Sequence, residues 1–315
     1  MSKTSLAYFV LVLTTIAWAS SLIFYKLILE QITPIVFVAL RYTLATPFLL
    51  VLALQQRRGK TIGTIRKNWK VLFIAGLSGP FISQVLQYIG LGMTTASDAL
   101  LLLNLTPIFA VILAAPLLKE KITPDKFLGL LIATAGACFI VLNTSPEYAT
   151  VDLQRIIGDV IVIVSTLFFA INGIAGKIAV KYENAVSVTF YSTLFAVPFI
   201  WISAVFLEDV TVLFQMSTET WFVITWISIV NTVIAFILYY ESMKYIEAGR
   251  VQITLNMIGV WGVLMSVIVL QESVTLLQIA GGFLTVIGVI IAQMTQIRKK
   301  PSEDLITLEE SSQSD

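Results

Sequence analysis

Histidine is absent from this chain of 315 residues, and cysteine occurs once, as Cys138. Without histidine, neither a serine–histidine pair nor a histidine-based zinc motif can form, and the commonest proton shuttle near neutral pH is missing. A single cysteine cannot form a disulfide within the chain. We therefore expect no catalytic residues, no metal site and no cofactor, and we disfavour an enzymatic function.

Charged residues are also scarce, at 12% of the chain, whereas a soluble domain has about twice that fraction. Hydrophobic residues make up 57%, and the mean hydropathy is +0.91. They form long runs, and about 20 apolar residues in a helix cross the ~30 Å hydrocarbon core of a bilayer. Ten such runs lie near residues 6–26, 34–54, 70–91, 97–117, 125–143, 156–176, 185–207, 220–240, 249–270 and 274–295. The sequence thus predicts an all-α integral membrane protein with ten transmembrane helices in a lipid bilayer.

Basic residues are distributed unevenly between these runs. If all ten runs cross the membrane, 17 of the 20 lysine and arginine residues fall on the side that holds both chain ends. Loops rich in lysine and arginine stay in the cytoplasm. We therefore expect a multi-pass protein of a prokaryotic cell (cytoplasmic) membrane, with both termini in the cytoplasm. The net charge of +1 gives no reason to expect a nucleic-acid partner.

The second half of the chain repeats the first. A shift of 152 positions places Trp69 on Trp221 and Asn104 on Asn256, and nearer the N-terminus the shift is 151. Each copy contains five of the predicted helices, and an odd number inverts the second copy in the membrane. Inverted repeats are typical of secondary transporters. We expect a first repeat at 1–142, an extracytoplasmic linker at 143–155, a second repeat at 156–297 and a disordered cytoplasmic tail at 298–315.

Several motifs occur in a characteristic order. They are Trp18-Ala-Ser-Ser, Ala39-Leu-Arg41-Tyr, Asn104-Leu-Thr-Pro107, Lys119-Glu120-Lys-Ile-Thr123 and the later echo Glu272-Ser-Val-Thr275. Their order, spacing and duplication between residues 5 and 295 resemble the drug/metabolite transporter superfamily, specifically its EamA-type ten-helix members. The resemblance implies a central cavity between two inverted five-helix repeats. It also implies export or exchange of small metabolites such as amino acids.

Arg41 is the sharpest candidate for a substrate-binding residue. It lies seven residues after Pro34, about 10 Å below the outer surface by the rise of a helix. A guanidinium inside a membrane needs a partner. That partner is either a substrate carboxylate or phosphate, which the arginine fork binds well, or Asp98 in a structural ion pair. The sequence leaves both open.

Further candidates are amides and aromatic residues inside the predicted spans: Trp18, Tyr88, Asn104, Asn172, Tyr239, Asn256 and Trp261. The amides either line the cavity or hydrogen-bond neighbouring helices, and Asn231 has the same ambiguity. The aromatic residues either line a cavity for an amphipathic ligand or pack in the core.

Other residues are expected to have structural roles. Glu120 and Glu272 precede the last helix of each repeat, where a helix dipole stabilises a carboxylate. The small residues Gly129, Gly136 and Gly288 permit close contact between helices. We expect them to pack within the chain, with a homodimer face as the alternative.

Carboxylates are missing from the middle of the predicted spans. Asp98 and Asp159 lie near the membrane boundaries, so few residues suit a buried proton relay. We expect facilitated diffusion or exchange of a small-molecule substrate by alternating access, with proton coupling through either aspartate as the fallback. Amino acids are the leading substrate class. The alternatives are other organic anions, drugs, or a non-transport membrane receptor or scaffold.

Overall fold

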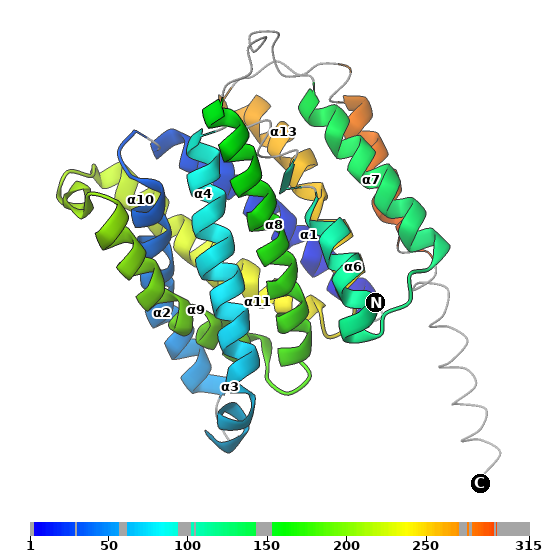
Figure 1. Cartoon of the computed structure of the whole chain (residues 1–315), viewed down its shortest axis with the longest axis horizontal. Helices are drawn as coiled ribbons and strands as arrows, with labels where there is room; N and C mark the ends of the chain where they lie inside the picture. Colours follow the sequence, from blue (N-terminus) through cyan, green and yellow to red (C-terminus); the bar gives the residue numbers. More distant parts are fainter. Residues whose placement is uncertain are drawn as a thin grey trace.

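The computed structural model describes residues 3–28, 30–56, 62–93, 102–103, 105–142, 153–270, 276, 279–292 and 294. Within these ranges all regular secondary structure is helical, as the sequence predicts (Figure 1). The elements in chain order are α1 (Lys3–Ile28), α2 (Pro34–Gln56), α3 (Ile62–Gly76), η1 (Leu77–Ser83), α4 (Gln84–Met93), α6 (Thr106–Leu118), α7 (Pro124–Leu142), α8 (Leu153–Ala179), α9 (Ala185–Leu207), η2 (Val210–Phe214), α10 (Thr218–Trp226), η3 (Ile227–Ile234), α11 (Ala235–Ser242), α12 (Ala248–Leu255) and α13 (Met257–Leu270). Ile279–Ala292 forms a further apolar helix. The elements η1 and η3 are π-helical, and η2 is a 3₁₀ helix.

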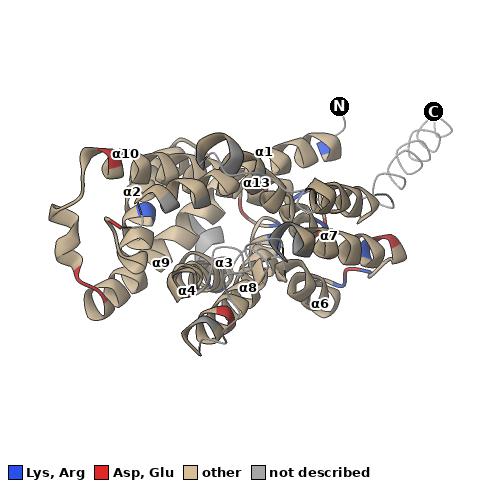
Figure 2. Ribbon diagram, turned by 90° about the horizontal axis from the view of Figure 1, so that it is seen from above, with Lys and Arg blue, Asp and Glu red and all other residues tan. Residues whose placement is uncertain are grey.

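Six of the described segments are long and apolar enough to cross a membrane. They belong to α1, α2, α8, α9 and two composite segments, Asn68–Met93 and Thr218–Ser242, in which a π-helical turn joins two α-helices. The helices α6 and Ile279–Ala292 are apolar but shorter. Large apolar side chains such as Phe206 and Ile268 are exposed, and most of the ribbon carries no charged residue (Figure 2). These are the features of a multi-pass membrane protein, whose apolar surface faces lipid.

The two copies of the sequence repeat have matching elements. Helices α2 and α9 are both 23 residues long, and their starts are separated by the 151-residue shift of the repeat. The turns η1 and η3 also occupy equivalent places, each inside a composite span. A π-helical turn is rare and often marks a functional site. The repeat therefore extends to an unusual detail of helix geometry.

Side chains from other helices complete the hydrogen bonding of both π-helical turns. Pro80 in η1 has no backbone N–H, so a carbonyl of the preceding turn lacks its usual donor. Asn172 Nδ2 on α8 donates to the Ala75 carbonyl over 2.8 Å. In η3, Trp18 Nε1 donates to the Asn231 carbonyl over 3.0 Å, and the Asn231 amide donates to a carbonyl of α1. Asn172 and Asn231 therefore bond neighbouring helices.

Two glutamates cap helices in the opposite half of the chain. Glu208, which follows α9, accepts hydrogen bonds over 2.9–3.0 Å from the backbone N–H groups of Ile35 and Val36 in the first turn of α2. Glu120 accepts from the first N–H groups of α12, over 2.7 Å from Ala248 and 3.2 Å from the next residue. The sequence predicts a helix dipole beside Glu120. The structure identifies that helix as α12 of the second half, and not α7, which directly follows Glu120 in the chain.

Buried charges connect the α6–α7 loop to the start of α12. Lys126 Nζ lies 2.7 Å from Glu247 Oε2 and 3.4 Å from Glu120 Oε2. Arg250 lies 3.1 Å from the same Glu247 oxygen and 3.1 Å from Asp125. Lys126 and Arg250 are only 1% and 2% exposed. Each buried cation thus faces two carboxylates, because an unpaired buried charge is strongly destabilising.

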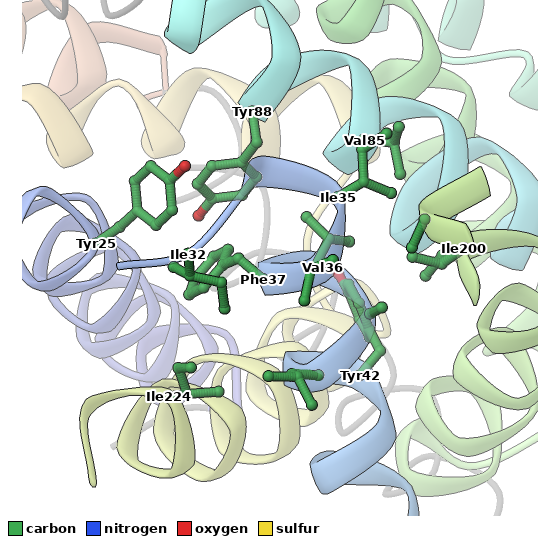
Figure 3. Close-up of a cluster of buried hydrophobic side chains, with 14 of the residues drawn as sticks. Tyr25, Ile32, Ile35, Val36, Phe37, Tyr42, Val85, Tyr88, Ile200 and Ile224 are labelled. Carbon is green, nitrogen blue, oxygen red and sulfur yellow. The ribbon is translucent and has the colours of Figure 1, made fainter. Parts of the chain in front are cut away.

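An apolar cluster packs the C-terminal end of α1 against α2, α4, α9 and α10 (Figure 3). The ring centroids of Tyr25, Phe37 and Tyr88 lie 4.6–5.0 Å apart. Near the other end of α1, Ala7 packs in a cluster with Val251 of α12, one residue beyond the buried Arg250. The bundle is therefore held by aromatic packing at one end of α1 and by ion pairs near the other.

Helix α7 packs against Ile279–Ala292 at the edge of the molecule (Figure 1). A Cβ atom added at Gly129, Gly136 or Gly288 would lie 2.5, 2.4 or 2.3 Å from a backbone nitrogen of the partner helix. Backbones this close leave no room for a side chain. These small residues therefore pack within the chain, as we expected. The homodimer stays a prediction.

The close contact of α7 with Ile279–Ala292 makes Gly136→Ala destabilising. Its Cβ would meet backbone atoms of Thr285 and Gly281, and overpacking of this kind lowers the free energy of unfolding by about 1–3 kcal/mol. Gly282→Ala is the matched control, because a Cβ there meets nothing within 4 Å. Unfolding of the purified variants in detergent is the measurement. Equal stability of the two variants would contradict this packing.

Glu247→Gln should lower the melting temperature at neutral pH and have less effect in acid. Burial raises the pKa of Glu247, but the hydrogen bond from Lys126 and the charges of Lys126 and Arg250 outweigh it and hold the pKa below its ordinary value of 4.5. The resulting stabilisation is present above the unfolded pKa and is lost as the pH falls through the folded pKa. Melting curves from pH 7 downward test this, with Glu241→Gln as control because Glu241 forms a more exposed pair with Lys244. A pH-independent difference between wild type and Glu247→Gln would exclude this carboxylate as the cause.

Candidate functional site

A cavity with about 830 Å³ of empty space, part of it open to solvent, lies inside the bundle. Helices from both halves of the chain contribute to its walls. The lining residues are Trp18, Ser21, Arg41, Ser83, Gln84, Gln87, Tyr88, Leu103, Thr106, Pro107, Phe169, Phe236, Leu255, Asn256, Ile258 and Gly259.

A single residue separates two helices beside this cavity. Helix α12 ends at Leu255 and α13 begins at Met257, and Asn256 between them breaks the α-helical hydrogen-bond pattern while its backbone stays in the right-handed helical region, at φ −59° and ψ −18°. Leu255, Asn256, Ile258 and Gly259 line the cavity. From the first half, Thr106 and Pro107 of α6 line it as well.

Two residues beside the cavity have a local geometry that the hydropathy of the runs at 97–117 and 249–270 does not predict. The structure places Pro107 in the first turn of α6, where a missing N–H is tolerated. Asn256 N–H bonds to the Ile253 carbonyl three residues back, over 3.2 Å, which tightens the end of α12. Hydropathy alone cannot register either feature, because the residues around them are apolar.

Arg41 projects from α2 into the cavity and is only 3% exposed. Its Nε donates to Thr232 Oγ1 of η3 over 2.7 Å. Its Nη1 donates to Gln84 Oε1 over 3.1 Å and to the Tyr88 hydroxyl over 3.5 Å, both on α4. The guanidinium is thus held between the two composite spans that contain the π-helical turns.

The partners of Arg41 in the described part of the chain are all uncharged. No carboxylate of the described residues lies within 4.0 Å of its guanidinium. Asp98 lies outside the described residues, so the ion pair between Arg41 and Asp98 stays a prediction. A buried guanidinium with neutral partners keeps a strong attraction for an anion.

Aromatic side chains form an apolar wall beside this charge. The ring centroid of Trp18 lies 5.7 Å from that of Phe169 and 5.0 Å from that of Phe236, and all three residues line the cavity. Tyr88 also lines it, next to Arg41. The site therefore combines one positive charge with a wall of π-faces, which suits a ligand that has an anionic end and an apolar end.

The structure brings together four of the residues that the sequence singles out, Arg41, Trp18, Tyr88 and Asn256, in the lining of one cavity. Three others are placed elsewhere. The Tyr239 ring packs against Trp18, and its hydroxyl accepts a hydrogen bond from Gln252 Nε2 over 2.7 Å. Trp261 Nε1 donates to Thr15 Oγ1 over 3.0 Å. The Asn172 amide donates to the Ala75 carbonyl and to the Tyr240 hydroxyl.

The remaining candidates are Asn104, Asp98 and Asp159. Asn104 and Asp98 lie outside the described residues. Asp159 is half-buried near the start of α8 and is not among the lining residues. Ten residues separate it from Phe169 of the lining, which is about 15 Å along a helix.

Sequence reasoning missed Phe169 and Ser21, although the repeat contains a signal for both. At the 151-residue shift, Phe169 is the mate of Trp18, and Ser21 is the mate of Asn172. Both line the cavity, and Ser21 Oγ has no hydrogen-bond partner among the described residues. The candidate list could have been extended by taking the repeat mates of each chosen residue.

Several relatives of this chain are named uncharacterized transporters. An uncharacterized transporter of Archaeoglobus fulgidus is 28% identical over 301 residues, which cover 94% of this chain and 99% of the relative. The uncharacterized transporter YyaM of Bacillus subtilis is 24% identical over 255 residues, 81% of this chain and 82% of its own. A crystal structure at 18% identity superposes with a TM-score of 0.76 over 95% of this chain and 99% of that chain, and so shares its fold.

The family comparison covers both halves of the chain. Residues 5–142 and residues 156–294 each match the EamA-like transporter family. This agrees with the drug/metabolite transporter motifs of the sequence, with the apolar helices and with a cavity lined by residues of both halves. The chain belongs to the EamA-like transporter family.

Proposed function

We propose that this protein is a secondary transporter that exports or exchanges small metabolites, with amino acids as its substrate class. The observation that carries the proposal is the position of Arg41 in a cavity to which both halves of the chain contribute. A substrate carboxylate binds the Arg41 fork, and an apolar side chain packs on Trp18, Phe169 and Phe236. Multiply charged phosphate esters rank lower, because Arg41 is the only charged residue in the described lining.

The membrane arrangement is part of the same proposal. Ten helices span the cytoplasmic membrane as two inverted five-helix repeats at 1–142 and 156–297, joined by an extracytoplasmic linker at 143–155. Both termini are cytoplasmic. The matching elements of the two halves and the basic residues near Lys126 and Arg250 support this arrangement.

Alternating access requires that the cavity close at one end while it opens at the other. In the proposed orientation the ion pairs of Lys126, Glu247 and Arg250 lie toward the cytoplasmic end, and the cluster around Tyr25 and Phe37 lies toward the outer end. Opening of either end then requires helix movement that separates these contacts. We propose transport down the substrate gradient, with coupling through Asp98 or Asp159 as the alternative.

Loss of the Arg41 charge should abolish export. Cells that overproduce the protein are expected to accumulate one or a few metabolites in the medium, detected by untargeted mass spectrometry against empty-vector cells. Arg41→Ala should reduce this excess at least ~10-fold at equal expression, because it removes the charge that binds the anionic end. Arg41→Lys keeps the charge without the fork and should retain part of the export.

A loss of export in Arg41→Ala that is caused by misfolding has to be distinguished from one caused by loss of the anion site. Thr232→Val removes the hydroxyl that Arg41 bonds, but it leaves the guanidinium in the cavity, so its export should stay within about threefold of wild type. Purified Arg41→Ala should melt near the wild-type temperature. Full export by Arg41→Ala would refute the anion site, and a pH gradient that drives uptake without a substrate gradient would refute uncoupled transport.

Filling the cavity should block export without a change of charge. A Cβ atom at Gly259 or at Gly262 meets nothing within 4 Å, but only Gly259 lines the cavity. Gly259→Leu should therefore lower export at least ~10-fold, whereas Gly262→Leu, on the same helix, should leave it within about twofold of wild type. The readout is the same excretion assay at matched expression. Equal effects of the two substitutions would show that the cavity is not the transport site.

A further inference from the structure

The residue between α12 and α13 carries a carboxamide whose donor nitrogen has no partner in the described part of the protein. Asn256 is 2% exposed and lines the cavity, and its Nδ2 has no hydrogen-bond partner among the described residues. Its backbone is satisfied, because the N–H bonds to the Ile253 carbonyl and the carbonyl accepts from Gly259, both over 3.2 Å. The side chain is therefore not what holds the break in place.

Other buried amides in the bundle show what a structural role looks like. Asn172 and Asn231 are both fully buried, and each donates to a carbonyl of a neighbouring helix. In hydrocarbon an amide donor without a partner is costly. Asn256 differs from Asn172 and Asn231 in lining the cavity and in lacking such a bond. A ligand in the cavity is the partner that this difference indicates.

The rest of the lining restricts what that ligand can be. Arg41 binds an anionic group, and the described lining contains no carboxylate that would pair with an ammonium group. An uncharged carboxamide can take the place of the missing carboxylate. It donates from Nδ2 to an oxo or hydroxyl oxygen, and it accepts at Oδ1 from an ammonium group. One neutral residue can thus bind either kind of polar substituent.

Resting on the proposed function, we infer that Asn256 is a specificity-determining residue, which binds the polar substituent next to the carboxylate that Arg41 holds. The ligand class is then small 2-substituted carboxylic acids, which includes amino acids and 2-oxo acids alike. Acids without a polar group at that carbon bind more weakly, because they leave the Asn256 amide unpaired.

Three probes with the same carbon skeleton test this inference: L-leucine, 4-methyl-2-oxopentanoate and 4-methylpentanoate. Their binding to the purified full-length protein is measured by calorimetry. Wild type should bind the first two at least ~10-fold more tightly than 4-methylpentanoate, because only these two pair with the amide. In Asn256→Leu the three affinities should converge to within about threefold.

Asn256→Asp supplies the sharper readout, because it has nearly the same shape. An aspartate attracts an ammonium group and repels an oxo oxygen, so this variant should bind leucine at least ~10-fold more tightly than 4-methyl-2-oxopentanoate. A general loss of structure would weaken all probes together and could not produce this change of preference. Gly262→Ala is the matched control, because Gly262 lies on α13 outside the lining and a Cβ there meets nothing within 4 Å, and it should keep the wild-type order of affinities.

Two results would overturn the inference. One is wild-type protein that binds neither leucine nor the oxo acid, and the other is an Asn256→Leu variant that keeps the wild-type preference. Calorimetry does not depend on transport, so the two proposals fail separately. Binding that depends on Asn256 without excretion from cells would remove the transport proposal alone. Excretion that depends on Arg41 without any Asn256-dependent preference would remove this inference alone.

Discussion

Polar groups inside a membrane have to find their partners within the protein, and this constraint organises the whole bundle. The carbonyl left without a donor near Pro80 bonds Asn172, the first amides of α2 bond Glu208, and the buried Lys126 faces two carboxylates. Asn172, Glu208 and Glu247 are each distant along the chain from the group they bind. Among the cavity-lining residues, Asn256 Nδ2 and Ser21 Oγ have no partner in the described part of the protein.

The two halves share a backbone pattern but differ in chemistry. Arg41 has Ser192 as its repeat mate, and Trp18 has Phe169. Two halves with matching elements thus line a cavity in which the positive charge, among the described residues, comes from the first half alone. For the anionic ligand that we propose, this asymmetry fixes the end of the cavity wall to which its charge binds, although both halves contain a π-helical turn.

Sequence patterns predict the features that depend on local composition. Hydropathy identifies helices such as α2 and α9, and the repeat pairs them, because both signals are read along the chain. Arg41 and Trp18 are selected because they lie inside predicted spans, and both line the cavity. Tyr239 and Trp261 are not among the lining residues. Their helices are apolar on both faces, so hydropathy cannot predict which face of the helix meets the cavity. The helix break at Asn256 and the cap from Glu208 depend on contacts far along the chain, which no local pattern encodes.

The reciprocal caps have a consequence for the order of synthesis. A ribosome completes α2 long before it adds Glu208, which is 173 residues beyond Ile35. Until then the first backbone N–H groups of α2 have no Glu208 carboxylate to bind. Likewise, Glu120 is synthesised before the N–H groups of α12 that it accepts from. The hydrogen bonds that cap α2 can therefore form only after α9 has been synthesised, and those that Glu120 accepts can form only once α12 has begun.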